Sequence, residues 1–214
     1  MKSNITERVA NEPAFRELFN SGRRRKILPN QVVLAAGTKP DTLYLILSGH
    51  VAVESTDSEG AELLLAYMFA GDFFGEMGLF SDVDMRSAGV RARSECLVLE
   101  VSYARFLELA QKYSSLWLEL AGQLAARLRV VNRRLAMMQS MQVADRVWLV
   151  LSELAARSDA PRSPQGSMIR LTRDELGKLA GCSRDVAGIA LREFEHQGRL
   201  IRQAVVVPTS RDRH

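Results

Sequence analysis

A glycine-rich segment, Gly71-Asp-Phe-Phe-Gly-Glu-Met-Gly-Leu-Phe80, contains the residues of this 214-residue chain that are best suited to chemistry. A glycine-rich turn that opens a short helix presents backbone N–H groups without intrahelical partners, and such groups bind anions. Arg86 and Ser87 follow shortly afterwards. A guanidinium can donate two parallel hydrogen bonds to a phosphate, and a neighbouring hydroxyl can add another. The spacing of Gly75 and Glu76 to Arg86 and Ser87 predicts a phosphate site.

Glu76 needs a different role, because a carboxylate repels a phosphate. A carboxylate can accept a hydrogen bond from a sugar hydroxyl, so Glu76 suits the ribose of a nucleotide. The simpler alternative for this segment is a set of tight β-turns beside a surface arginine.

A helical segment from Trp117 to Met138 connects this site to the C-terminal part of the chain. Its apolar residues recur at alternating steps of four and three, as in a coiled-coil seam. They are Trp117, Ala121, Leu124, Leu128, Val131, Leu135 and Met138. Two alternatives fit this pattern: a core helix buried in its own domain, or a helix that pairs with its copy in a homodimer. The homodimer is favoured because the helix lies between the segment with the phosphate-type turn and a C-terminal helix-turn-helix pattern.

The segment from Thr172 to Gln197 has the pattern of a helix-turn-helix. Thr172 with Glu175 three residues later predicts a capping box at the start of a helix over 173–180. Gly181-Cys182 predicts the turn, and Ser183 predicts the cap of a second helix over 184–197. Gly198 predicts its end, and residues 199–202 and 204–207 predict a two-stranded wing. Before them, we expect a helix over 143–156, a loop over 158–167 and a short strand over 168–171.

Short apolar segments separated by turn residues run from Ile27 to Val101 and indicate β-structure. They are Val32–Leu34, Leu43–Leu47, Val51–Val53, Leu63–Phe69, Val90 and Leu97–Val101. This spacing favours a sandwich, jelly roll or barrel. Residues 1–20 predict a short amphipathic helical region. The basic run Arg23–Lys26 predicts a solvated turn, or else a surface for an acidic protein or for DNA.

We therefore expect an α+β chain in three parts: a β jelly-roll domain (1–111), a dimerisation helix (112–140) and a winged helix-turn-helix domain (141–214). Residues 140–214 contain 12 Lys and Arg against 9 Asp and Glu, a balance of +3 out of a total of +4. A basic C-terminal third suits a nucleic-acid partner.

Composition excludes several other classes. No apolar run approaches the roughly 20 residues of a membrane span, and the polar N-terminus lacks the apolar segment of a secretory signal. Cys96 and Cys182 are too few for a disulfide framework or a four-thiolate cluster. We expect a cytoplasmic protein that is not an enzyme, because its three histidines are scattered and no catalytic constellation is visible. A haem bound through His50 or Cys96 stays open as an alternative, which an absorbance scan would test.

From about residue 23 to residue 207 the sequence resembles the bacterial cyclic-AMP receptor protein (catabolite activator protein) family of transcription regulators. The resemblance is carried by Thr42–Gly49, Gly71–Phe80, Arg86–Ala88, Glu100–Tyr103 and Thr172–Arg184. It implies that the jelly roll binds a cyclic nucleotide as effector, with no cofactor. It implies that Arg86 and Ser87 hold the cyclic phosphate, while Glu76 and the backbone of Gly75 hold the ribose hydroxyl.

The resemblance breaks where family members read the adenine. Two adjacent hydroxyl residues do so on the dimer helix, and the matching positions here are Val131 and Asn132. Valine cannot hydrogen-bond, whereas asparagine offers a donor and an acceptor. Three outcomes fit: weaker binding of cyclic AMP, a different nucleotide such as cyclic GMP or cyclic di-GMP, or a dimer that binds DNA without a ligand.

The resemblance also implies a palindromic double-stranded DNA operator, read from the start of the second helix of the helix-turn-helix. Arg184 suits a guanine edge and Asp185 a cytosine amino group. Ile189 stands where the family has a second reading arginine and suits a thymine methyl group. Ser183 is a further expected DNA-binding residue, and the expected phosphate contacts come from Thr172, Arg173, Arg192 and Arg202. Arg23, Arg25 and Arg105 match family positions that contact RNA polymerase.

Overall fold

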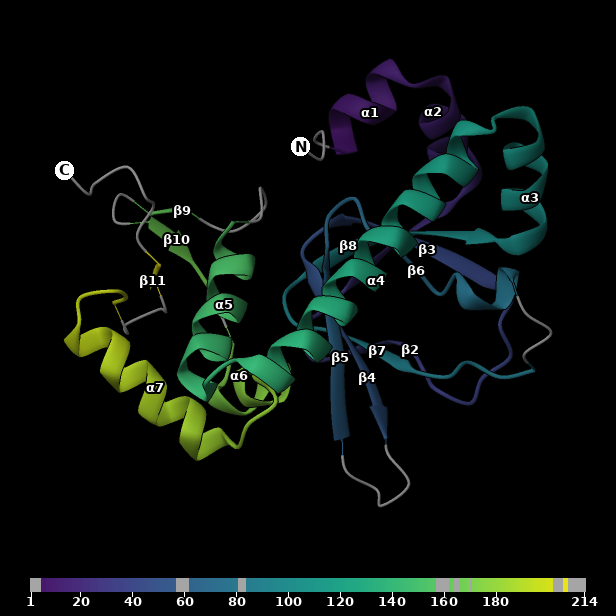
Figure 1. The fold of residues 1–214 in the computed structure, drawn as a ribbon. Helices are drawn as coiled ribbons and strands as arrows, with labels where there is room; N and C mark the ends of the chain where they lie inside the picture. Colours follow the sequence, from purple (N-terminus) through teal and green to yellow (C-terminus); the bar gives the residue numbers. More distant parts are fainter. Residues whose placement is uncertain are drawn as a thin grey trace. The chain divides into compact units, whose positions relative to one another are not determined.

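The computed structural model describes residues 5–56, 62–80, 84–156, 162–163, 166–169, 171–201 and 206–207. They form two compact units, Met1–Arg129 and Val130–His214, and the boundary falls within one helix, α4. Figure 1 shows the β-strands gathered mainly in the first unit and helices dominating the second, so the expected α+β class is confirmed.

The first unit contains two four-stranded antiparallel sheets, in the orders β1-β8-β3-β6 and β2-β7-β4-β5. Its strands are β1 (Arg23–Ile27), β2 (Val32–Leu34), β3 (Thr42–Ser48), β4 (His50–Thr56), β5 (Glu62–Phe69), β6 (Phe73–Phe74), β7 (Gly89–Ala92) and β8 (Cys96–Ser102). Its other elements are α1 (Ile5–Asn11), α2 (Pro13–Ser21), the 3-10 turn η1 (Met77–Leu79), α3 (Tyr103–Lys112) and the start of α4 (Ser115–Ser140). The strands match the apolar segments of the sequence.

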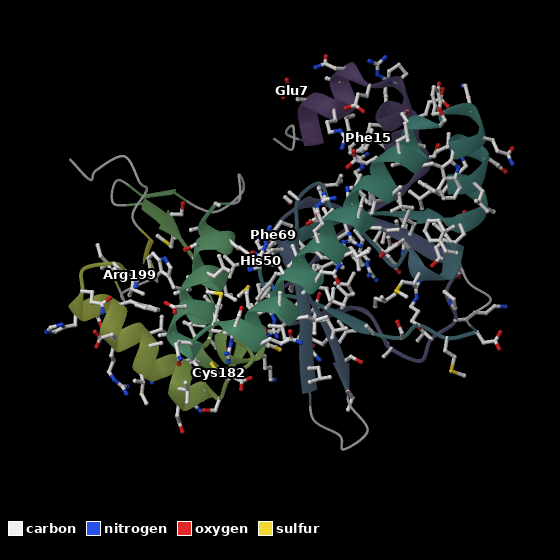
Figure 2. The ribbon with its side chains drawn as sticks, in the orientation of Figure 1. Glu7, Phe15, His50, Phe69, Cys182 and Arg199 are labelled. Carbon is white, nitrogen blue, oxygen red and sulfur yellow. The ribbon has the colours of Figure 1, made fainter. Side chains whose placement is uncertain are left out.

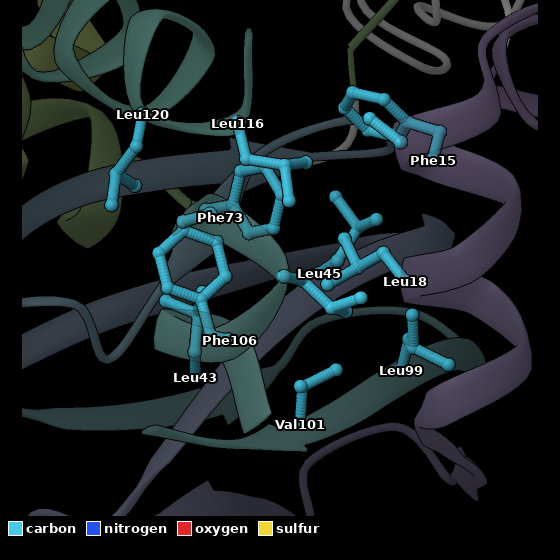
Figure 3. Packing of buried hydrophobic residues seen from close by; sticks show 13 residues of the cluster. Phe15, Leu18, Leu43, Leu45, Phe73, Leu99, Val101, Phe106, Leu116 and Leu120 are labelled. Atoms are coloured by element: carbon cyan, nitrogen blue, oxygen red, sulfur yellow. The ribbon is translucent and has the colours of Figure 1, made fainter. Parts of the chain in front are cut away.

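Strand β8 explains how both faces of the first sheet are buried. Because side chains alternate along a strand, Leu99 and Val101 point to one face while Cys96 and Val98 point to the other. Cys96 and Val98 join a core with residues of β2, β4 and β7 from the second sheet. Leu99 and Val101 pack under α2, α3 and α4, as Figure 3 shows with Phe15, Phe106 and Leu116.

The N-terminal region is helical as predicted, although it contains two helices, and the turn expected after it needs correction. Residues 13–21 form a second helix, because Pro13 occupies a first-turn position of α2, where proline is well tolerated. The basic run Arg23–Lys26 is a strand rather than a turn, at the edge of its sheet. Glu100 on β8 pairs with both Arg23 and Arg25, at 2.6 and 2.8 Å, and so stabilises this charged edge.

Helix α4 departs from the predicted seam at its start. Leu116 and Leu120 are fully buried, and the ring of Trp117 packs edge-on against Phe106, with 5.3 Å between centroids. Trp117 therefore faces its own domain, and Leu118, 74% exposed, is the solvent-facing residue instead. Further along, the predicted seam residues are exposed: Leu128, Val131, Leu135 and Met138.

The second unit contains the end of α4, α5 (Val143–Ala155), β9 (Arg162–Ser163), β10 (Gly166–Met168), α6 (Arg173–Ala180), α7 (Arg184–His196) and β11 (Val206–Val207). The expected break after α4 is confirmed at Met141 and Gln142. The ring of Trp148 packs edge-on against Phe194, and the guanidinium of Arg199 lies 3.8 Å from the Trp148 centroid; Figure 2 labels Arg199.

The small sheet of this unit corrects the expected loop and strand. Strands β9 and β10 lie at 162–163 and 166–168, inside or beside the segment predicted as a loop, and the sheet order is β11-β10-β9. Segments of two or three residues are too short for an alternation pattern, so the sequence could not reveal them. Within the predicted strand 199–202, the structure gives no strand at Arg199 or Leu200 and a single bridge at Ile201. The predicted wing turn near Gln203 lies outside the described residues.

Candidate functional site

The glycine turn predicted to bind phosphate leaves β6 at Gly75. Its φ of +76° is left-handed, a conformation that other residues rarely adopt. A Cβ at this position would also come within 2.8 Å of Arg86 Nη1 and 3.2 Å of the Thr42 carbonyl oxygen. Glu76 follows and opens η1, as the expected short helix. The turn therefore requires glycine for its backbone conformation and for the approach of Arg86.

Arg86 is held beneath this turn. Its side chain is only 6% exposed, and its Nη2 donates to the Thr42 carbonyl oxygen at 3.0 Å. Its Nη1 donates to the Gly75 carbonyl oxygen at 3.4 Å. The same carbonyl oxygen also accepts a hydrogen bond from the Tyr103 hydroxyl. Burial raises the pKa of Tyr103, so this phenol remains a donor at neutral pH. The structure thus brings Gly75, Glu76 and Arg86 together, as predicted from their spacing.

Glu76 is buried and bound by an arginine that the sequence analysis missed. Arg127 of α4 donates from Nη1 to Glu76 Oε1 at 2.8 Å and from Nη2 to the Phe73 carbonyl oxygen. A buried carboxylate needs a cationic or hydrogen-bonding partner, because its desolvation is costly. Arg127 supplies that partner and ties the turn to α4.

Gln123, one helical turn before Arg127, extends this connection. Its Oε1 accepts from the Phe73 N–H at 2.8 Å, and its Nε2 donates to the Gly71 carbonyl oxygen at 2.8 Å. Leu116, Leu120, Gln123 and Arg127 recur at helical spacing on the buried side of α4. A glutamine and an arginine that continue a leucine stripe were the sequence signal for these contacts.

The remaining predicted ligand residues are exposed. Ser87 is exposed beside Arg86. Val131 and Asn132 belong to the second unit, where both side chains are exposed on α4. The Asn132 amide is therefore exposed to solvent, whereas Val131 presents only an aliphatic side chain.

The predicted caps of the helix-turn-helix are confirmed. Thr172 Oγ1 accepts from the Glu175 N–H at 3.2 Å, and Glu175 Oε2 accepts from the Thr172 N–H at 2.7 Å. Ser183 Oγ accepts from the Val186 N–H at 3.3 Å and caps α7. Gly181 ends α6 with a φ of +66° and makes the turn. The second helix ends at His196, one residue earlier than predicted.

Helix α7 exposes a mixed face. Arg184, Asp185, Ile189 and Arg192 are exposed, while Ala187, Ala190, Leu191 and Phe194 are buried against the unit. The expected phosphate-contact residues Thr172 and Arg173 are also exposed, at the start of α6. A Cβ at Gly188 would meet the Arg173 side chain at 3.4 Å, so Arg173 lies across α7. Arg202 lies outside the described residues.

Three further features bear on the alternatives. In the part of the chain that the structure describes, no three His, Cys, Asp or Glu side chains come together as metal ligands. The His50 ring stacks on Phe69 across β4 and β5, with 5.6 Å between centroids (Figure 2). None of the described helices is long and apolar enough to cross a membrane.

A two-sheet roll with an arginine-backed glycine turn, joined through a long helix to a helix-turn-helix, defines a ligand-sensing transcription regulator. Residues 24–113 match the cyclic nucleotide-binding domain family. The chain is 39% identical to the cAMP-activated global transcriptional regulator Vfr of Pseudomonas aeruginosa over 82% of this chain and 83% of that protein. It is 41% identical to the cAMP-activated global transcriptional regulator CRP of Salmonella typhimurium over 87% of this chain and 89% of that protein.

A solved structure agrees with these relatives. The c-di-GMP responsive global regulator CLP of Xanthomonas campestris has a TM-score of 0.78 and 31% identity, covering 92% of this chain and 99% of CLP. The chain therefore belongs to the cyclic-AMP receptor protein family of transcription regulators, and the predicted family is confirmed. The family consists of regulators rather than enzymes.

Proposed function

We propose that this chain is a homodimeric, sequence-specific DNA-binding regulator controlled by a cyclic nucleotide, cyclic AMP or a related one, bound in the roll of residues 1–111. The observation that carries the proposal is the convergence of Arg86 and Glu76 on the turn at Gly75. Arg86 offers a buried guanidinium for the cyclic phosphate, and exposed Ser87 adds a hydroxyl. Glu76 offers a carboxylate for the ribose hydroxyl.

Arg127 supports coupling between this site and the rest of the chain. It binds the Glu76 carboxylate and the Phe73 carbonyl oxygen from α4. A sugar hydroxyl that donates to Glu76 competes with Arg127 for the same carboxylate. The ligand therefore acts on α4, which continues into the unit with the helix-turn-helix.

The dimer is supported by the exposed apolar side chains of α4, which are Leu118, Leu128, Val131, Leu135 and Met138. The dimerisation helix, expected over 112–140, begins at Ser115, and burial of these side chains against a second copy of α4 would remove them from water, at about 25 cal/mol per Å² of apolar surface. A dimer also places two α7 helices for a palindromic operator, as the symmetry of such sites requires.

DNA recognition is supported by the exposed start of α7. Arg184 is free to donate two hydrogen bonds to a guanine edge and Asp185 to accept from a cytosine amino group. Thr172, Arg173, Ser183 and Arg192 are exposed nearby for phosphate contacts. The protein would act in the cytoplasm, where the DNA is.

RNA polymerase is the further partner that we propose. Arg23 and Arg25 share Glu100, and Arg105 pairs with Glu108 at 2.8 Å and donates to Ser21 Oγ at 3.0 Å. These residues of β1, β8 and α3 form one charged surface, consistent with the contact that the family resemblance implies.

A second candidate is a family member that responds to cyclic di-GMP or needs no ligand. It is favoured by Val131, which cannot hydrogen-bond to a base, and by the likeness to CLP, described as c-di-GMP responsive. Asn132 keeps a donor and an acceptor, and we favour cyclic AMP or cyclic GMP for that reason.

The test is a thermal-shift panel of cyclic AMP, cyclic GMP and cyclic di-GMP, with Arg86→Ala as the control. We expect at least one nucleotide to raise the melting temperature of the natural chain and not that of Arg86→Ala. The double variant Val131→Thr, Asn132→Ser should shift preference toward cyclic AMP, up to about tenfold for each hydrogen bond regained. No shift with any nucleotide at millimolar concentration would contradict control through this site.

A further inference from the structure

An aliphatic side chain stands in the middle of the exposed face of α7. Asp185, Ile189, Arg192 and His196 follow one another at steps of four, three and four, so they form one stripe along the helix. All four side chains are exposed, and Ile189 is 56% exposed. Its neighbours along the stripe are charged or polar, whereas the buried side of α7 already contains the leucine, alanine and phenylalanine residues that hold the helix in place.

More than half of the Ile189 side chain is therefore left out of the packing of this unit. The part of an isoleucine side chain that stays in water adds no hydrophobic free energy to folding. Its burial in a complex would add favourable free energy to binding. Three arginines, Arg173, Arg184 and Arg192, are exposed on this surface beside the carboxylates of Asp185 and Glu193. Arginines bind the phosphate backbone of DNA. With the backbone held in this way, the stripe would face the base edges of the major groove.

One base feature of the major groove is apolar, namely the C5-methyl group of thymine. We propose that Ile189 reads a thymine methyl group in each half of the operator, beside the guanine read by Arg184. Five residues separate the two, a rise of roughly 7.5 Å along the helix, so the thymine lies within about two base pairs of that guanine. This inference rests on the proposed DNA-binding function and specifies its sequence preference.

The experiment first selects binding sites for the full-length chain from a randomised duplex pool, with and without cyclic AMP. Each thymine near the selected guanine is then replaced in turn by uracil, cytosine and 5-methylcytosine, and the dissociation constant is measured. Uracil lacks the methyl group and 5-methylcytosine has it. At one position we expect thymine to bind about fourfold more tightly than uracil, and 5-methylcytosine about fourfold more tightly than cytosine, as one buried methyl group predicts.

Two variants assign this effect to a residue. In Ile189→Ala both methyl preferences should fall to near onefold. In Val186→Ala they should persist, because Val186 is less exposed, at 38%, and flanks the stripe. Equal affinities for thymine and uracil, or methyl preferences that survive Ile189→Ala, would overturn the inference while leaving DNA binding intact. A pool that yields no preferred sequence would overturn the proposed function as well.

Discussion

The guanidinium of Arg127 lies 2.8 Å from the carboxylate of Glu76, and through this pair the glycine turn is bound to α4. The pair compensates a carboxylate that is only 6% exposed. It also explains how a carboxylate can stand beside the proposed phosphate site, since its charge is already balanced. We therefore propose that one ion pair serves both nucleotide binding and the transmission of its effect to α4.

Replacement of Arg127 by methionine should weaken both stability and nucleotide binding. The change leaves Glu76 buried without its charged partner, which costs up to about 3–5 kcal/mol for a fully buried pair. Because the Arg127 side chain is 25% exposed, we expect about 1–3 kcal/mol, measured by urea denaturation. Arg129→Met, at an exposed position on the same helix, is the matched control and should change little. Similar denaturation midpoints for the two variants would argue against the role of the pair.

Gly75→Ala should abolish nucleotide binding. The φ of +76° strains alanine, and the new Cβ would meet Arg86 Nη1 at 2.8 Å. Gly37 is a matched control, because its φ of +74° carries the same strain but nothing lies within 4 Å of its Cβ. Calorimetric titration with the nucleotide that stabilises the natural chain should therefore show binding for Gly37→Ala and none for Gly75→Ala. Intact binding by Gly75→Ala would mean that the close approach of Arg86 is not needed.

Thr172→Ala should destabilise the helix-turn-helix by about 1 kcal/mol, because it removes the hydroxyl that caps α6. Thr172→Ser keeps an equivalent hydroxyl and should retain most of the stability. Thermal unfolding without DNA isolates this effect from any phosphate contact. An alanine variant as stable as the serine variant would show that the capping box contributes little.

Burial raises the pKa of the Cys96 thiol, so the folded state favours the neutral form. The stabilising contribution of this thiol is therefore complete at neutral pH. It should decline as pH rises above about 8.5, where the thiol of the unfolded chain begins to ionise. The difference in unfolding free energy between the natural chain and Cys96→Ala should then narrow from pH 8 to pH 10. A constant difference would place the thiol in a more polar environment.

The sequence predicted the elements whose patterns are long. Residues 173–180 form the predicted helix because Thr172 with Glu175 and Gly181 mark both of its ends, and the longer strands match their apolar segments. Strands β9 and β10 were missed because two or three residues define no period. The edge strand at Arg23–Lys26 was missed because its stabilising partner, Glu100, is distant in sequence.

The candidate site was predicted only in part for a similar reason. Gly75, Glu76 and Arg86 lie within one short segment, so their spacing alone brought them together. Arg127 comes from another element, so its sequence spacing to Glu76 gives no signal. The heptad pattern of α4 predicts a contact face of apolar residues and does not include Gln123 or Arg127. Gln123 and Arg127 continue the helical spacing of the buried residues Leu116 and Leu120, and this spacing is the signal that predicts their contact with the glycine turn.

The central claim is that a nucleotide in the roll controls DNA binding by the second unit. The most direct test is the dissociation constant for a selected palindromic duplex, measured by fluorescence anisotropy while cyclic AMP, cyclic GMP or cyclic di-GMP is titrated. We predict that at least one nucleotide changes this constant by about 5- to 150-fold, as typical coupling free energies allow, and that Arg86→Ala removes the response. A DNA affinity that stays the same with every nucleotide, or that responds equally in Arg86→Ala, would contradict the account.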